Sequence, residues 1–236
     1  MSHAVCLWWR LRVELRQPKR SGALAEQAYV ALRDAILSHQ LEPGDRLSVP
    51  ELARQLGISR SPTREAITRI AHEGLARLEP HQGAVVADIR SEDLVEIYAL
   101  REVLEGLAAR LAAQRASDDD VTRLRQLMEE HEQAAAVDDV ERHYELDQRF
   151  HSEIRRVAGN RRLVESLDVL QGQIRIGMFT THRSLGGLPQ TVAEHRAIFN
   201  AVAARDPEAA EHAGRAHVAR LQEELRHAER TDAFPS

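Results

Sequence analysis

The chain has 236 residues and a formal net charge of −5, with 43% apolar but only 4% aromatic residues. This length allows two ordinary domains, whose cores must consist mainly of Leu, Ala, Val and Ile. The single cysteine, Cys6, excludes an internal disulfide framework and a cysteine-rich zinc module, and it suits a reducing compartment. No apolar run approaches the ~18 residues of a membrane span. We therefore expect a cytoplasmic protein with no membrane partner.

The charge is distributed unevenly along the chain. Residues 1–90 carry a formal charge of +3, whereas residues 91–236 carry −8. A basic first third with an acidic remainder is typical of a chain in which only the first third meets phosphates. Residues 1–20 contain an apolar stretch too short for a signal-peptide core, with arginines on the wrong side of it. We interpret residues 1–20 as a disordered extension.

Three helices are predicted in the first third of the chain. Apolar residues recur at helical spacing over residues 24–38, which predicts the first helix. Ser48 begins a short second helix, and Gly57 ends it. A third helix begins with Ser61 as N-cap and Pro62 as its first residue, and it ends before residue 74.

Two short β-prone runs follow the third helix. Residues 75–79 and 84–87 favour strands, and residues 80–83 form the tip of a hairpin between them. Helix, short helix, helix and hairpin in this order predict a winged helix-turn-helix DNA-binding domain over residues 21–89.

The third helix carries the candidate DNA contacts. In a helix-turn-helix, the second helix of the motif enters the major groove with its N-terminal residues foremost. Arg60 and Arg64 lie at that end, where a guanidinium can contact guanine through two hydrogen bonds. Either arginine alone could be a solvated surface charge, but the order of elements around them favours DNA contact. The predicted DNA-contacting residues are Arg33, Ser59, Arg60, Ser61, Thr63, Arg64 and Gly83.

This region resembles the N-terminal domain of GntR-family regulators. The matching segments are residues 32–37, 41–47, 51–66, 73–75 and 82–86. The resemblance implies that Arg60 and Arg64 are the main base and phosphate contacts, and that Gly83 marks the tip of the wing. Pro50 departs from the pattern, because relatives can carry a DNA-contacting arginine there. The resemblance therefore implies that this contact is absent.

After residue 89 the pattern is helical in about six segments. The breaks fall near residue 117, near residue 137, and at 159–160, 186–189 and 206–207. We therefore predict a mainly α protein in which an all-α helical bundle follows the winged helix-turn-helix. The bundle is expected over residues 91–230, followed by a tail at 231–236.

Four polar residues lie within apolar stripes of this predicted bundle. A buried carboxylate is costly without a partner. Three imidazoles and one carboxylate together suit a divalent transition metal such as zinc, nickel or manganese. Each histidine alone is better explained as a core residue or as a hydrogen-bond partner between helices, but the four residues together favour a metal site. The predicted ligands are Asp147, His151, His195 and His217.

The same spacing resembles the FCD ligand-binding domain of the FadR branch of the GntR family. In that domain an Asp-x-x-x-His pair and two later histidines bind the metal, which matches the four residues above. Six helices rather than seven imply the VanR-like subgroup. The resemblance covers about residues 24–228.

Arg101 is the main candidate for binding an effector. It falls on an apolar stripe of the first bundle helix, where a guanidinium must face a carboxylate or a wet cavity. The resemblance implies that Arg101 holds the carboxylate of an organic acid beside the metal. From the residues alone, an internal salt bridge with Glu105 stays open as an alternative. Arg175 and Asn200 are weaker candidates for the same cavity.

These features predict a transcriptional regulator, most simply a repressor, whose operator affinity is modulated by a small organic acid. A homodimer is expected, because a single short recognition helix reads too little sequence. One alternative is a hydrolase-like enzyme whose metal activates water, although no general base or nucleophile accompanies the predicted ligands at a recognisable spacing. The other alternative is a regulator with a purely structural metal.

Overall fold

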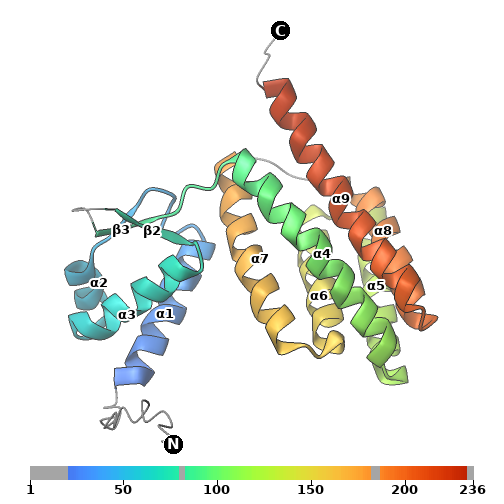
Figure 1. Ribbon diagram of the computed structural model, residues 1–236, viewed down its shortest axis with the longest axis horizontal. Helices are drawn as coiled ribbons and strands as arrows, with labels where there is room; N and C mark the ends of the chain where they lie inside the picture. The colour runs from blue at the N-terminus through green and yellow to red at the C-terminus, as the bar shows by residue number, and fades with distance from the viewer. Residues whose placement is uncertain (1–20, 80–82, 182–186, 233–236) are drawn as a thin grey trace, which may run out of the picture.

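The computed structural model describes residues 21–79, 83–181 and 187–232. Figure 1 shows a small N-terminal domain of helices and a sheet, beside a larger bundle of long helices. No helix in the described ranges is long and apolar enough to cross a membrane. The described helices are α1 (Ser21–Leu37), α2 (Val49–Leu56), α3 (Arg60–His72), α4 (Ser91–Arg115), α5 (Asp118–Ala136), α6 (Val140–Ala158), α7 (Arg161–Thr181), α8 (Leu188–Ala203) and α9 (Pro207–Asp232).

The N-terminal domain is a winged helix-turn-helix. Gly57 ends α2 in the left-handed conformation, with φ of 65°, which a glycine adopts without steric cost and which turns the chain sharply into α3. The sheet is antiparallel, and its strands β1 (Arg46–Leu47), β2 (Ala76–Glu79) and β3 (Gly83–Val86) are ordered β1-β3-β2. Apolar side chains of α1, α3 and β3 pack between the helices and the sheet, among them the fully buried Ile36, Ile70 and Val86.

Two details of this domain differ from the sequence-based expectation. The N-cap of helix α3 is Ser59 and its first residue is Arg60. Both lie two residues earlier than predicted, because the Ser-Pro pair suggested Ser61 as N-cap and Pro62 as the first residue. Strand β1 was not predicted, because two residues are too short to show a period-2 pattern. It pairs with β3, with Arg46 opposite Val85. The predicted extension at 1–20 and most of the hairpin tip lie outside the described residues.

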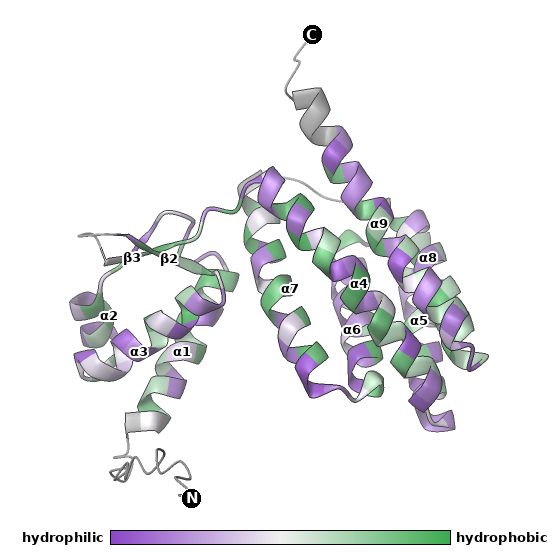
Figure 2. Ribbon diagram, in the orientation of Figure 1, coloured by the Kyte–Doolittle hydropathy of each residue, from purple (hydrophilic) through white to green (hydrophobic). Residues whose placement is uncertain are grey.

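The C-terminal domain consists of the six predicted helices, and Figure 2 shows hydrophilic and hydrophobic residues alternating along them. Helices α4 and α9 run side by side in Figure 1. A Cβ atom added at Gly106 would lie 2.4 Å from Cγ of Arg215, so the glycine permits a close approach of the two helices. This approach brings polar residues of α4 near the buried histidine of α9, which shapes the site described below.

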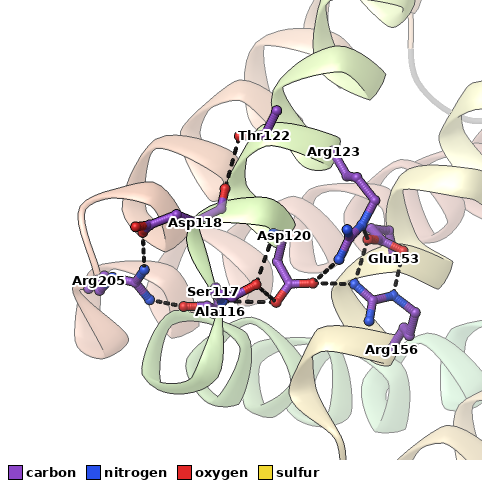
Figure 3. Close-up of polar contacts among 9 residues, drawn as sticks. All are labelled: Ala116, Ser117, Asp118, Asp120, Thr122, Arg123, Glu153, Arg156 and Arg205. Carbon is purple, nitrogen blue, oxygen red and sulfur yellow. Dashed lines mark hydrogen bonds and ion pairs between the residues drawn. The ribbon is translucent and has the colours of Figure 1, made fainter.

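Helix α5 is held against α6 by a network of charges shown in Figure 3. Ser117 is the N-cap of α5. Its backbone nitrogen and its hydroxyl both donate hydrogen bonds to the carboxylate of Asp120, at 2.8 Å and 2.6 Å. The same carboxylate pairs with Arg123 on α5 and Arg156 on α6. Asp120 therefore caps one helix and ties it to the next.

The two domains contact each other mainly through α7. The side-chain amide of Gln173 donates a hydrogen bond to the backbone oxygen of Glu73, at the C-terminus of α3, over 2.8 Å. Near the end of α7, the ring of Phe179 stacks on His39, with centroids 3.9 Å apart. A single apolar cluster includes Leu75 of the DNA-binding domain together with Ile89 and Ile174. The junction is therefore packed rather than a loose linker.

Candidate functional site

The exposed end of α3 presents the main candidate DNA contacts. Arg60, Ser61 and Arg64 are exposed there, and neither arginine forms an ion pair within the part of the chain that the structure describes. Ser59 at the N-cap makes no side-chain capping bond, which leaves its hydroxyl available for a phosphate. Unpaired arginines beside the positive end of a helix dipole form a suitable surface for a polyanion.

The wing lies beside this helix. Arg64 and Gly83 line the same surface groove, which runs between α3 and β3. Gly83 is exposed, and among the described residues other than its chain neighbours no atom lies within 4 Å of a Cβ added to it, so a DNA backbone could approach it closely. Arg46 lines the same groove and is exposed, although sequence reasoning missed it. Its position beside the wing depends on strand β1, which left no recognisable pattern.

Two of the predicted DNA contacts must be corrected. Thr63 is completely buried, and its hydroxyl donates a hydrogen bond to the backbone oxygen of Ser59 over 3.1 Å. It therefore supports the first turn of α3 from inside the domain. Arg33 pairs with Glu73 at 3.3 Å and lines a groove between α1 and α7. Its guanidinium therefore faces the C-terminal domain.

The three predicted histidine ligands meet in the centre of the helical bundle. One ring nitrogen from each of His151, His195 and His217 lies within 4.8 Å of the others. All three rings are buried, and His195 has no exposed surface. Nε2 of His195 lies 3.6 Å from a carboxylate oxygen of Asp147. Helices α6, α8 and α9 thus bring the four predicted ligands together.

Two acidic residues contact the Nδ1 atoms of two of these imidazoles and thereby orient the rings. Nδ1 of His217 donates a hydrogen bond to Glu194 over 2.8 Å, and Nδ1 of His151 lies 3.7 Å from a carboxylate oxygen of Glu105. These contacts direct Nε2 of both rings toward the cluster. Nε2 of His151 and both ring nitrogens of His195 are buried without a hydrogen-bond partner in the described structure. His151 therefore combines an unpartnered buried nitrogen with a carboxylate at its other nitrogen, an arrangement typical of metal ligands.

The protonation states of these groups also suit a cation. Burial lowers the pKa of His195 well below its usual range, and the neighbouring imidazoles lower it further. Burial likewise lowers the pKa of His217. Both rings are therefore neutral at pH 7, which is the form that binds metals. Burial alone would raise the pKa of Glu105, but His151 and Arg155 hold it well below its usual range.

A cavity of about 140 Å³ opens beside the histidine cluster. Arg101 and Asp147 both line it, as does His217, so a molecule in the cavity would adjoin both the guanidinium and the cluster. The Nε atom of Arg101 lies 3.5 Å from Glu105, which is the salt bridge that the sequence left open. Since Arg101 also lines the cavity, the salt bridge and a ligand contact are compatible.

The two weaker effector candidates lie elsewhere. Asn200 is exposed on α8 and does not line the cavity. Arg175 is exposed on α7 and lines the groove between the two domains, together with Arg33. Helical periodicity placed both residues in the correct helices but did not show which face of each helix meets the cavity.

Sequence reasoning missed the acidic residues behind the metal cluster and a second pair of buried histidines. Glu194 precedes His195 directly, and only the packing of α8 against α9 brings it to His217. His131 and His143 are both buried, on α5 and α6. The signal for His143 was available, because His143, Asp147 and His151 recur every four residues along α6.

Family models match both domains of the chain. The model "Bacterial regulatory proteins, gntR family" matches residues 24–86, and the model "FCD domain" matches residues 96–220. The second match alone covers more than half of the chain.

Individual relatives agree with these models. The chain is 30% identical over 203 residues to an uncharacterized HTH-type transcriptional regulator, YdhC, of Bacillus subtilis, covering 85% of this chain and 90% of the relative. It is 33% identical to a probable D-xylose utilization operon transcriptional repressor of Paenarthrobacter nicotinovorans, covering 72% and 74%.

A solved structure has the same fold. The structure described as E. coli McbR/YncC matches with a TM-score of 0.66 and 25% identity, covering 87% of this chain and 98% of the other. The relatives are transcriptional regulators, which decides against the hydrolase-like alternative. The chain therefore belongs to the GntR family of bacterial regulatory proteins, as a DNA-binding transcriptional regulator with a C-terminal FCD domain.

Proposed function

We propose that the protein is a repressor whose affinity for its operator changes when a small carboxylic acid binds at a divalent metal in the FCD domain. The observation that carries this proposal is the group of buried, unpartnered histidine nitrogens beside a cavity lined by Arg101 and Asp147. The repressor role is supported by two relatives that are named as repressors, the HTH-type transcriptional repressor RspR of Escherichia coli and the probable D-xylose utilization operon repressor.

The chemistry of the four residues fits a transition-metal ion. Three neutral imidazoles and one carboxylate are a common ligand set for zinc, nickel or manganese. When bound, the metal would supply a Lewis-acidic centre with positions left for a ligand oxygen. Asp147 is the only anionic residue among these ligands, so the loaded site keeps a net positive charge.

This net charge favours an anionic ligand. Arg101 adds a second positive group at the cavity, and a buried guanidinium binds a carboxylate well because it offers several N–H donors in one plane. A cavity of about 140 Å³ is close to the size that holds a benzene-sized molecule. The proposed ligand is therefore a short organic acid and not a long acyl chain.

Helix α7 is suited to connect the two sites. Gln171, Ile174 and Met178 of α7 line the cavity, whereas Gln173 bonds to the end of α3. A shift of α7 on ligand binding would therefore move the recognition helix. Coupling between distant sites of this kind is usually ~1–3 kcal/mol.

A homodimer is part of the proposal, because operators are usually read by two recognition helices. An exposed apolar stripe on α4 supports it: Leu100 is 60% exposed, Val103 is 55% exposed, and Leu107 follows one turn later. Analytical ultracentrifugation should show a dimer for the wild type and a monomer for Val103→Glu. Monomeric wild-type protein would exclude a dimer in free solution.

The proposal is tested by metal analysis and by calorimetry with organic acids. Wild-type protein purified without chelator should contain about one divalent metal ion per chain, and His195→Ala should contain little. The control is His212→Ala, which removes an exposed histidine of α9 and should keep the metal. A metal-free wild type would refute the metal site. An acid that binds equally well to wild type, Arg101→Ala and metal-stripped protein would refute the effector site.

A further inference from the structure

A pair of buried histidines that the proposed metal site does not use lies against the cavity. Nε2 of His131 on α5 is 2.9 Å from Nδ1 of His143 on α6, within hydrogen-bond distance. His143 lies one turn before Asp147 and lines the cavity with it, whereas His131 has no exposed surface. The pair therefore connects the protein interior to the wall of the ligand cavity.

Both imidazoles are buried, and burial disfavours the charged form of each ring. Each neutral ring carries a single N–H, so the hydrogen bond between the rings leaves two arrangements. Either His131 donates from Nε2, or His143 donates from Nδ1.

The burial of His131 decides between these arrangements. Nδ1 of His131 is buried without a hydrogen-bond partner in the described residues. If His143 were the donor, the single N–H of His131 would sit at this isolated Nδ1, and orphaned buried N–H groups are rare. His131 therefore donates from Nε2, and Nδ1 of His143 accepts. The remaining N–H of His143 is then at Nε2.

The Nε2–H group of His143 is the hydrogen-bond donor that this residue can offer to a molecule in the cavity. His143 is 7% exposed and lines the cavity, and within the described residues its side chain forms a hydrogen bond only through Nδ1. Arg101 and the metal ligand Asp147 line the same cavity. A short acid whose carboxylate is held by the metal and Arg101 would thus meet a further hydrogen-bond donor on the same wall.

We propose that His143 is a ligand-recognition residue whose Nε2–H donates a hydrogen bond to a second oxygen-bearing group of the bound acid. The inference deepens the proposed function and rests on it. It assigns a class of effector: short dicarboxylic or hydroxy acids are preferred over plain monocarboxylic acids of equal length. His131 is a positioning residue, because it fixes the tautomer of His143 without touching the ligand.

The tautomers can be tested without any ligand. Long-range ¹H–¹⁵N NMR spectra of histidine-labelled protein at pH 7 should show Nδ1 of His143 unprotonated and Nε2 protonated, with assignments from single variants. A protonated Nδ1 on His143 would overturn the proposal, since Nε2 would then be an acceptor that repels a carboxylate.

A matched pair of substitutions tests recognition of the ligand. The amide nitrogen of glutamine can replace the imidazole Nε2–H, so His143→Gln keeps a donor at the cavity. The shorter His143→Asn places its amide near the position of Nδ1, where it can still accept from His131 but cannot reach the cavity. Both variants should retain the metal. His143→Gln should have the lower melting temperature, because it leaves the buried N–H of His131 without an acceptor, so weaker ligand binding by the more stable His143→Asn would reflect recognition and not folding.

Calorimetry would compare matched mono- and dicarboxylates of three to six carbons, such as butyrate and succinate. We expect His143→Asn to bind the dicarboxylate at least ~10-fold more weakly than wild type, in line with the loss of a hydrogen bond to a charged group. His143→Gln should stay within about threefold, and the monocarboxylate should bind all three proteins alike. Equal dicarboxylate binding by all three proteins would overturn the role of His143. If wild type binds no acid of the series, the proposed effector class itself fails.

Discussion

The two functional regions of this protein hold their arginines in opposite ways. At the start of α3, Arg60 and Arg64 are exposed and have no acidic partner in the described ranges. In the bundle, Arg101 and Arg155 are buried and converge on the carboxylate of Glu105. The first region keeps its charge available for a polyanion, whereas the second neutralises its charge internally and leaves only part of it facing a cavity.

Because of this difference, substitutions in the two regions should have different effects on binding and on stability. An exposed, unpaired arginine contributes little to folding, so its removal should affect mainly DNA binding. A buried charge whose partner is removed remains desolvated, so a substitution in the bundle should affect folding as well as ligand binding. The following predictions test this contrast, from the largest expected effect to the smallest.

Removal of Glu105 should give the largest loss of stability. Glu105→Ala removes the buried carboxylate that pairs with Arg101 and leaves Arg155 with only the exposed Asp168, and breaking a buried ion pair in this way costs about 3–5 kcal/mol. Urea denaturation measures the effect. The control is Glu102→Ala on the same helix, whose partner Arg215 is half exposed, and which should cost less than about 1 kcal/mol. Similar losses for both variants would contradict the contrast between the regions.

Removal of Arg64 should affect binding alone. Arg64→Ala should weaken binding to an operator selected from a random duplex pool by about 1–3 kcal/mol, with an unchanged melting temperature. Arg60→Ala should in addition relax the base preference. Arg162→Ala provides a control, because it removes another exposed arginine, paired only with Glu165 on the same helix α7 of the FCD domain. Full affinity of Arg64→Ala in a gel-shift titration at fixed salt would show that α3 is not the recognition helix.

The junction should matter for the response to the effector. Gln173→Ala removes the hydrogen bond to the backbone of Glu73 and should reduce the change in operator affinity caused by a bound acid, by about 0.5–1.5 kcal/mol. Binding of the acid itself should persist. Gln222→Ala removes a comparable bond to the backbone of Val95 within the FCD domain. It should lower stability but leave the response intact, and the opposite result would rule out α7 as the connection.

The smallest effect concerns the charged cap of α5. Hydrogen bonds from Ser117 and pairing with Arg156 lower the pKa of Asp120, so its charged form stabilises the fold. This stabilisation is complete above the unfolded-state pKa of about 3.9 and is lost as the pH falls through the lower folded-state pKa. Asp120→Asn should therefore be less stable than wild type by about 1 kcal/mol or less at pH 6. The difference in unfolding free energy between the two proteins should shrink toward pH 2. A difference that stays constant with pH would contradict a stabilising role for the charged carboxylate.

Much of this organisation could be predicted from the sequence, because it depends on local patterns. Helical periodicity and Gly, Pro and Ser signals predicted six bundle helices, and the GntR-like motif predicted the exposed Arg60 and Arg64. The spacing of Asp147, His151 and the two later histidines predicted which residues share apolar stripes. The three histidines meet in the structure and Asp147 lies 3.6 Å from His195, while their role as metal ligands stays a prediction.

Only the tertiary structure decided which partner each of these residues finds. Thr63 lies on the apolar face of α3 with Ala66 and Ile70, a local signal that the prediction of a DNA contact did not use. No local pattern shows that Arg33 turns toward α7. The carboxylates of Glu105 and Glu194 and the pair formed by His131 and His143 depend on contacts between helices far apart in the chain. A sequence pattern gives the face of a helix on which a side chain lies, but the rotation and approach of the neighbouring helix determine which atoms it meets.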